Sequence, residues 1–298
     1  MAMRARFGLV ALAVAVRCAP GVTAQPSDSL AATRSGEDAI VTALNQQGTR
    51  AESGRVVVHV PADTLSADEA QALAARLNRG LEAIESHTHS PHAWQRRLAQ
   101  LDYYFPPSMF VSYTQPLLAR VFISFPRLGR GDAPTYHETV HAVLAPSMEY
   151  LRAHPEALDD TTPPPVWLFE GVATFVGGTV AAQLGVRDGD PLKVGPLDEL
   201  DANCAQALAT PVGAQIVPFI GAPGQPEGLV SRERRLEVAP PFYMCAASFT
   251  KYVSGRIGLD AVIDLLPAAD SRVALEAATH EGIAALRADW RKAIGAPP

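Results

Sequence analysis

Two histidines with a glutamate between them are the residues whose types and spacing best fit metal binding and catalysis. The segment at 137–141 reads HETVH. On a helix, residues four apart are separated by about 40° around the axis, so the imidazoles of His137 and His141 face one point. Zinc binds neutral imidazole nitrogens at about 2.0–2.1 Å. The side chain of Glu138 points elsewhere, which suits it to act as a base beside the metal.

A second interpretation of the same segment is purely structural. Thr135 and Glu138 have the spacing of a capping box, in which Thr135 is the N-cap residue and Glu138 bonds to the backbone. Pro134 and Pro146 would bound the helix under either interpretation. The two interpretations differ in whether the glutamate serves a metal site or the end of a helix.

A catalytic zinc site needs a third protein ligand and one position open for water. The extended motif with glycine at 144 and histidine or aspartate at 147 is excluded, because the chain has Leu144 and Ser147. The best candidate is Glu170, which interrupts an apolar segment that reads WLFEGVATF over 167–175. A carboxylate there is costly unless it is paired or binds a metal. We therefore expect Glu170 to be the third ligand; the alternative is an exposed glutamate on the polar face of a helix.

These two motifs together resemble those of the gluzincin zinc metallopeptidases. That group shares a thermolysin-like catalytic domain with the M1 aminopeptidases and the smaller bacterial peptidase MA-like proteins. The resemblance implies that His137, His141 and Glu170 bind Zn²⁺ and that Glu138 is the general base. Thr174, one turn after Glu170, is expected to hydrogen-bond a ligand or to lie on the helix surface.

The same resemblance implies a role for Tyr243. The segment from Tyr243 to Gly258 is similar to a later helix of the family, and the likeness covers about 56–294. In this interpretation Tyr243 opens a helix and donates to the oxyanion that forms when water attacks a carbonyl. Tyr136 and Tyr252 are rival donors. The aminopeptidase motif that grips a free amino group is not evident, so the resemblance does not imply exopeptidase activity.

Hydrophobic patterning predicts strands first and helices afterwards, which indicates an α+β fold. Strands are expected at Val56–Val60, Met109–Tyr113 and Val121–Phe125, the last as an edge strand along which an extended peptide pairs. The resemblance implies a thermolysin-like zincin domain, a small mixed sheet over a mainly helical C-terminal part. A capping box at Ser66 predicts a helix that continues to Ile84. Other helices are expected around 135–145, 166–176, 242–257, 259–266 and 272–294, with an irregular segment over 185–240.

The N-terminus has the pattern of a secretory signal. Two arginines precede ten apolar or small residues at 7–16, and a small-x-small pattern ends at Ala24. Such a run is too short for a hydrocarbon layer, which takes about 20 residues. We expect a signal peptide over 1–24, a secreted or periplasmic protein, and no stable membrane span after cleavage. Residues 25–54 are predicted as a flexible leader or pro-segment, and 55–298 as the zinc metallopeptidase-like domain.

The composition of the chain limits the classes of binding partner and the state of its cysteines. Basic residues number 25 against 31 acidic ones, for a net charge of −6, without a Lys/Arg block, which argues against a nucleic-acid partner. Loss of Cys18 with the signal would leave Cys204 and Cys245. In an oxidising compartment this pair is expected either to form a disulfide or to remain as two buried thiols.

The expected function is that of an exported zinc metallopeptidase. It would cleave peptide or protein substrates with a metal-activated water and a glutamate base. The alternatives are a metal-dependent hydrolase of a non-peptide substrate and a catalytically silent binding protein on the same fold.

Overall fold

The computed structural model divides into two units, residues 1–40 and 41–298. In the first unit only residues 26–40 are described, and they belong to helix α1 (Pro26–Gln47). The predicted signal peptide lies outside the described residues. The second unit is mixed α/β, with a small mixed sheet and a larger helical part. The described residues are 26–89, 98–108, 112–145, 165–188, 197–231, 233–268 and 270–297.

Five short strands form the sheet in the order β1-β2-β3-β5-β4. The three central strands, β2, β3 and β5, are parallel, and the edge strands β1 and β4 run antiparallel to their neighbours. The strands are β1 (Thr49–Ser53), β2 (Val56–Val60), β3 (Leu101–Tyr104), β4 (Tyr113–Gln115) and β5 (Arg120–Phe122).

The edge strand differs from the predicted one. The expected edge, Val121–Phe125, corresponds to β5, which pairs with β3 on one side and with β4 on the other. Within the described residues the last strand at this end of the sheet is β4, so the prediction of Val121–Phe125 as the edge strand was wrong. A strand of three residues is too short to produce a hydrophobic alternation that can be recognised in the sequence. Residues 109–111 of the predicted strand Met109–Tyr113 lie outside the described part.

The segment predicted as a flexible leader contains regular structure. Helix α1 ends at Gln47, and Thr49–Ser53 forms β1, paired along its whole length with β2. Gly54, with φ of 55°, begins the tight turn between them. The flexible-leader prediction is therefore wrong for 49–53. The strand is not recognisable in the sequence because residues 49–53 are mostly polar. Pairing with the valine-rich β2, and not the hydrophobicity of the segment itself, determines that it forms a strand.

One face of the sheet is covered by helix α2 (Ala67–His87). The predicted capping box is confirmed: Ser66 Oγ accepts from the Glu69 backbone N–H, and the Glu69 carboxylate accepts from the Ser66 N–H. Leu77, Leu81 and Ile84 are fully buried in the core that α2 shares with the sheet. Burial of each such side chain contributes about 1.5–3 kcal/mol to the free energy of unfolding.

The opposite face carries a row of stacked rings. The strand register sets His59 beside Tyr104, Tyr104 beside Phe122, and Phe122 beside Tyr113. The ring centroids lie 4.4, 5.3 and 5.0 Å apart in that order. The row therefore connects four strands, including the short edge strand β4, to one another.

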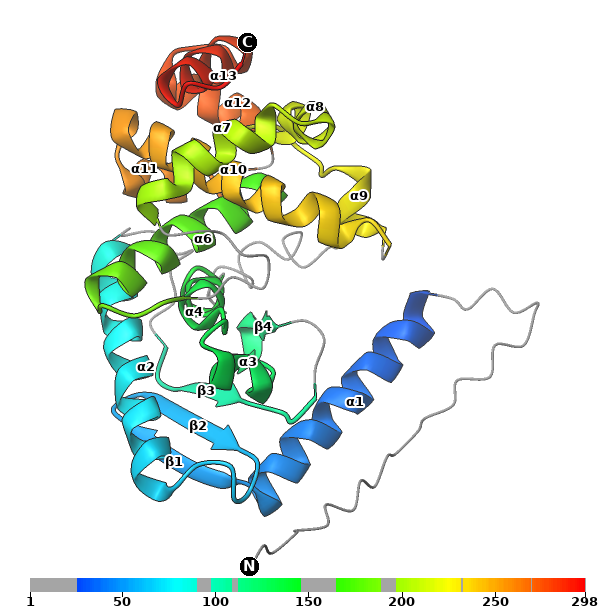
Figure 1. Cartoon of the computed structure of the whole chain (residues 1–298), viewed down its shortest axis with the longest axis vertical. Helices are drawn as coiled ribbons and strands as arrows, with labels where there is room; N and C mark the ends of the chain where they lie inside the picture. Colours follow the sequence, from blue (N-terminus) through cyan, green and yellow to red (C-terminus); the bar gives the residue numbers. More distant parts are fainter. Residues whose placement is uncertain are drawn as a thin grey trace, which may run out of the picture. The chain divides into compact units, whose positions relative to one another are not determined.

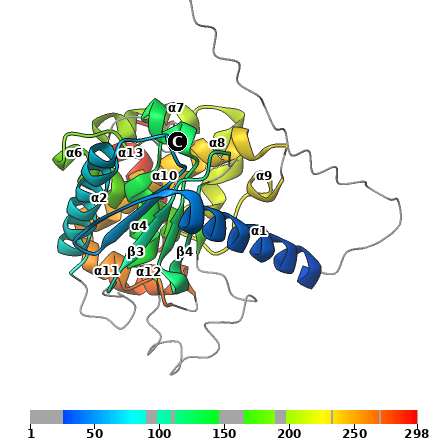
Figure 2. The same ribbon diagram turned by 90° about the horizontal axis from the view of Figure 1, so that it is seen from below.

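The helical part is built around a stack of three helices. Helix α4 (Thr135–Val143) packs over β4 and β5 and against α6 (Val166–Gln183), and α6 packs against α10 (Arg235–Ile257) (Figure 1 and Figure 2). Gly171 allows the close approach of α6 to α10, because a Cβ there would lie 2.7 Å from the Ala246 carbonyl oxygen.

Further helices hold α10 in place. Cys204 and Cys245 form a disulfide between α7 and α10, which is one of the two alternatives that the sequence leaves open. Trp290 Nε1 donates to Ser248 Oγ, which donates to the carboxylate of Asp201. The helices that contact α10 are α7 (Leu200–Leu208), α8 (Pro211–Ile216), α9 (Glu227–Val230), α11 (Leu259–Ile263), α12 (Ser271–Thr279) and α13 (Ile283–Ala293). Helix α3 (Phe125–Arg130) follows β5 along the chain.

Three predictions for this part need correction. Helix α10 begins at Arg235 and continues through Pro240 and Pro241, so Tyr243 lies inside the helix and does not open it. The prolines remove two backbone donors but do not end the helix. The predicted helix over 272–294 is two helices, separated at His280, which has φ of 57°. The segment 185–240, predicted as irregular, contains α7, α8 and α9.

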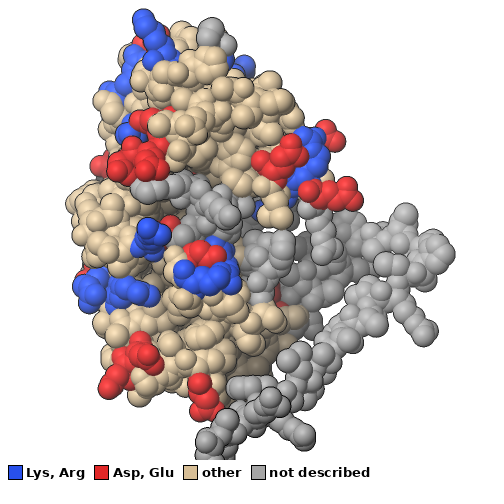
Figure 3. Space-filling view, viewed as in Figure 1, with Lys and Arg blue, Asp and Glu red and all other residues tan. Residues whose placement is uncertain are grey.

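Charged side chains on the face drawn in Figure 3 form small scattered groups, some of one sign and some of both. Among the helices of the described ranges, none combines the length and the apolar character that crossing a bilayer requires.

Candidate metal centre

The HETVH motif lies on α4, and all nine residues of this helix are buried. His137 and His141 are one turn apart, and their imidazoles meet at one point, with the two Nε2 atoms 3.1 Å apart. The rings are nearly perpendicular, at 89°. The predicted convergence of the two histidines is therefore present.

Glu170 reaches the same point from α6. Its Oε2 lies 3.3 Å from His137 Nε2 and 3.6 Å from His141 Nε2. Gly177 permits α6 to come this close, because a Cβ there would lie only 2.8 Å from the backbone nitrogen of His137. The structure thus brings together the three residues that the sequence selects as ligands.

The separations of these ligand atoms fit a tetrahedral zinc site. Bonds of about 2.0–2.1 Å at tetrahedral angles place neighbouring ligand atoms about 3.3–3.4 Å apart. The three separations, 3.1, 3.3 and 3.6 Å, bracket that range. Two imidazoles and one carboxylate are also the donor set of catalytic zinc sites that keep a fourth position for water. The residues present therefore fit the ion.

The charge of the cluster suits a divalent cation. Burial raises the pKa of Glu170, but hydrogen bonds from His137 and His141 and their charges outweigh burial and hold that pKa well below its usual range. The carboxylate is therefore ionised at neutral pH. A bound metal would replace the histidine protons that make these contacts, so both imidazoles would be neutral and the three ligands would carry one negative charge. A divalent ion held by them would keep a net charge near +1.

Two neighbours fix the orientation of the imidazole rings. Thr174 Oγ1 lies 3.2 Å from His137 Nδ1, which is the first of the two alternatives expected for this position. A proton on Nδ1 that bonds to this oxygen leaves Nε2 free to bind a metal. The ring of Phe169 stacks on His141, with centroids 4.1 Å apart and planes 21° apart.

Glu138 lies on the same helix and is 5% exposed. Burial raises its pKa, and the charges of the two histidines and a hydrogen bond from Thr114 oppose that rise. The Thr114 hydroxyl, on β4, lies 2.8 Å from Glu138 Oε2. The N-cap residue of α4 is Pro134, without a side-chain cap, so the capping-box interpretation of Thr135 and Glu138 is wrong.

Asp188, which the sequence does not single out, caps α4 from another part of the chain. Its Oδ1 accepts from the Tyr136 N–H at 2.9 Å and from the Thr135 hydroxyl at 3.0 Å, and its Oδ2 accepts from the His137 N–H at 2.8 Å. Burial raises the pKa of Asp188 to about 6, against these hydrogen bonds and the charge of His137. A carboxylate at a helix N-terminus is stabilised by the helix dipole, and here it fixes the turn that carries His137.

Of the three tyrosines considered as oxyanion donors, Tyr243 lies beside the cluster. It is buried, and its ring is stacked on His137 with centroids 6.4 Å apart. The ring of Tyr136 packs instead against Gly80 of α2. Tyr252 stacks on Phe249 and accepts from Arg256 at the surface.

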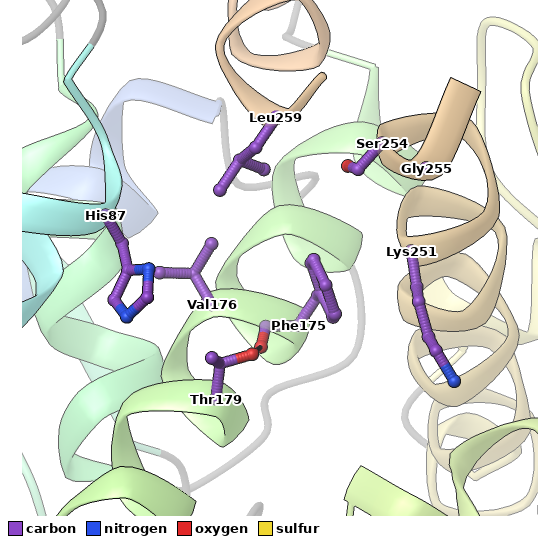
Figure 4. Close-up of a pocket in the computed structure, with 8 residues that line it drawn as sticks. All are labelled: His87, Phe175, Val176, Thr179, Lys251, Ser254, Gly255 and Leu259. Carbon is purple, nitrogen blue, oxygen red and sulfur yellow. Dashed lines mark hydrogen bonds between the residues drawn. The ribbon is translucent and has the colours of Figure 1, made fainter. Parts of the chain in front are cut away.

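A separate cavity of about 340 Å³ lies on the other side of α6 (Figure 4). Phe175, Val176 and Thr179 of α6 line it, together with Lys251 of α10. Thr179 is nine residues beyond Glu170, which places the two side chains about 180° apart around the helix. The cavity is therefore distinct from the metal cluster.

No protein-family model matches this chain, and comparisons with curated proteins and with solved structures give no match either.

Proposed function

We propose that this protein is a zinc-dependent metallopeptidase of the gluzincin type, with a thermolysin-like catalytic domain. The observation that carries the proposal is the triangle of His137 Nε2, His141 Nε2 and Glu170 Oε2, whose sides of 3.1, 3.3 and 3.6 Å match the edges of a tetrahedral zinc site.

Zinc bound by these residues would act as a Lewis acid and lower the pKa of a bound water toward about 7. Glu138 would accept the proton of that water and deliver it to the leaving amine. Its raised pKa supports this role, because a base that must also release its proton works best with a pKa nearer to the working pH. Burial beside the cluster keeps the carboxylate out of bulk water.

Residues outside the metal cluster would bind the substrate and stabilise the oxyanion. Tyr243 would donate its hydroxyl proton to the oxyanion in a hydrogen bond, and its place beside His137 supports that role. Within the described residues β4 is the last strand at its end of the sheet, and an extended peptide would lie along this part of the sheet. The expected substrate is therefore a peptide or a protein segment that can adopt an extended conformation.

Export to the periplasm or the medium belongs to the same proposal. The sequence pattern of a signal peptide over 1–24 supports it, and so does the disulfide between Cys204 and Cys245, since structural disulfides form mainly in oxidising compartments.

The test compares three proteins: wild type, Glu138→Gln, and Glu52→Gln. Glu52 is an exposed residue on β1 and controls for the chemical change. Each protein is assayed for bound zinc and for cleavage of a mixed peptide library analysed by mass spectrometry. We expect one zinc per chain in all three, cleavage by wild type and Glu52→Gln, and a loss of at least about 100-fold in Glu138→Gln. Zinc without peptide cleavage in the wild type would contradict the peptidase proposal, and an active Glu138→Gln would contradict the assigned base.

A further inference from the structure

We infer, on the basis of the proposed function, that Thr114 is a positioning residue for the general base. Its hydroxyl holds the carboxylate of Glu138 in place, which makes the edge strand β4 a support of the catalytic machinery as well as part of the sheet.

The contact is double. Thr114 Oγ1 lies 2.8 Å from Glu138 Oε2 and also 2.8 Å from the backbone carbonyl oxygen of Glu138. One hydroxyl therefore reaches both the end of the glutamate side chain and the backbone from which it starts. The three rotatable bonds between these two points are then restricted to the conformations that keep both distances.

Glu138 has particular need of such a contact. Its side chain is buried, and a buried carboxylate without a hydrogen-bond donor is costly. In the described part of the chain, the Thr114 hydroxyl is the donor that reaches this carboxylate. The hydrogen bond also sets the direction in which the carboxylate points, which the attraction of nearby charges alone would not do.

The position of the hydroxyl is itself well defined. Thr114 is opposite Val121 in the ladder between β4 and β5, and Val121 is fully buried. Tyr113, the preceding residue, is held by stacking on Phe122. α4 packs directly on β4. The hydroxyl is thus carried by a backbone that is fixed from two sides.

A hydroxyl also suits a base that gains and loses a proton. It has one hydrogen and two lone pairs. It can donate to the carboxylate of Glu138, and it can accept from the carboxylic acid while it donates to the Glu138 carbonyl oxygen. The contact therefore persists when the water proton arrives, without movement of the strand.

The inference is tested with Thr114→Val, which keeps the shape and removes the hydroxyl, and Thr114→Ser, which keeps the hydroxyl. Thr179→Val is the matched control, because Thr179 also donates to a carbonyl oxygen but lies on the far side of α6. For Thr114→Val we expect unchanged zinc content, KM within about twofold, and kcat lowered about 10- to 100-fold, as for a misplaced catalytic group. Thr114→Ser should recover kcat to within about threefold, and Thr179→Val should match wild type.

A kcat for Thr114→Val within twofold of wild type would overturn the inference, and so would an equally large loss in Thr114→Ser. If the wild type cleaves no peptide, the proposed function fails, and crystal structures of wild type and Thr114→Val decide the inference separately. We then expect the Glu138 carboxylate to move by more than about 1 Å in the variant. An unmoved carboxylate would overturn it.

Discussion

Gly177 should control both the stability of the fold and the affinity for zinc, because it lies where α6 meets α4. A Cβ at this position would be 2.8 Å from the His137 backbone nitrogen and 3.0 Å from its Cα. Both atoms belong to a backbone that is held at its N-terminus by Asp188. Ordinary contact begins at 3.4 Å, so Gly177→Ala must separate the two helices by about 0.6 Å.

That separation has two consequences of different size. Overpacking of this kind costs about 1–3 kcal/mol, which lowers Tm by roughly 2–12 °C in a protein of this size. The distance between Glu170 on α6 and the histidines on α4 changes as well. Metal ligands tolerate displacements of only about 0.2 Å, so we expect the Kd for zinc to rise at least about tenfold.

Gly178→Ala is the matched control. It makes the same chemical change one residue later. Among the described residues its Cβ would meet the flexible end of Leu197, at 3.4 Å. Tm is measured by calorimetry on the zinc-free proteins, and zinc affinity by competition with a chromogenic chelator. If Gly177→Ala matches Gly178→Ala in both quantities, the close helix contact does not set the ligand geometry, and the reasoning is refuted.

Three further predictions concern single contacts. The double variant Cys204→Ala/Cys245→Ala should lose about 4 kcal/mol of unfolding free energy in urea, since the disulfide closes a loop with a sequence separation of 41; a loss below about 1 kcal/mol would contradict this. Ser66→Ala should cost about 1 kcal/mol through loss of the N-cap, measured in the same way, and an unchanged midpoint would show that the cap does not stabilise the fold. Thr174→Val should weaken zinc binding about 10- to 100-fold, because His137 loses the hydrogen-bond partner of its Nδ1. Thr174→Ser should bind zinc as the wild type does. Equal zinc affinities in all three proteins would show that this contact does not orient the His137 ring.

Much of the candidate site follows from the sequence because it depends on local periodicity. The four-residue spacing of His137 and His141 fixes their common direction on any helix. Glu170 stands out because a carboxylate in an apolar helix needs a partner. In the fold, β2 and α2 were predicted correctly for the same reason: a run of valines and a capping box followed by an apolar stripe are local signals.

The remaining features depend on contacts between distant segments. Asp188 caps a helix that begins 53 residues earlier, and Thr114 reaches a glutamate 24 residues later. Neither residue type is unusual, so nothing in its own neighbourhood marks it. The strand β4 was not predicted because it is defined by its pairing with β5. Helix α10 was predicted too short because the pair Pro240 and Pro241 is typical of a helix boundary.

The central claim is that His137, His141 and Glu170 bind one zinc ion. X-ray diffraction at the zinc absorption edge, on crystals of the full chain grown with stoichiometric zinc, tests it most directly. We predict a single strong anomalous peak about 2.0–2.2 Å from Nε2 of both histidines and from the carboxylate of Glu170. A map without a peak among these three side chains, from crystals that contain zinc, would contradict the account.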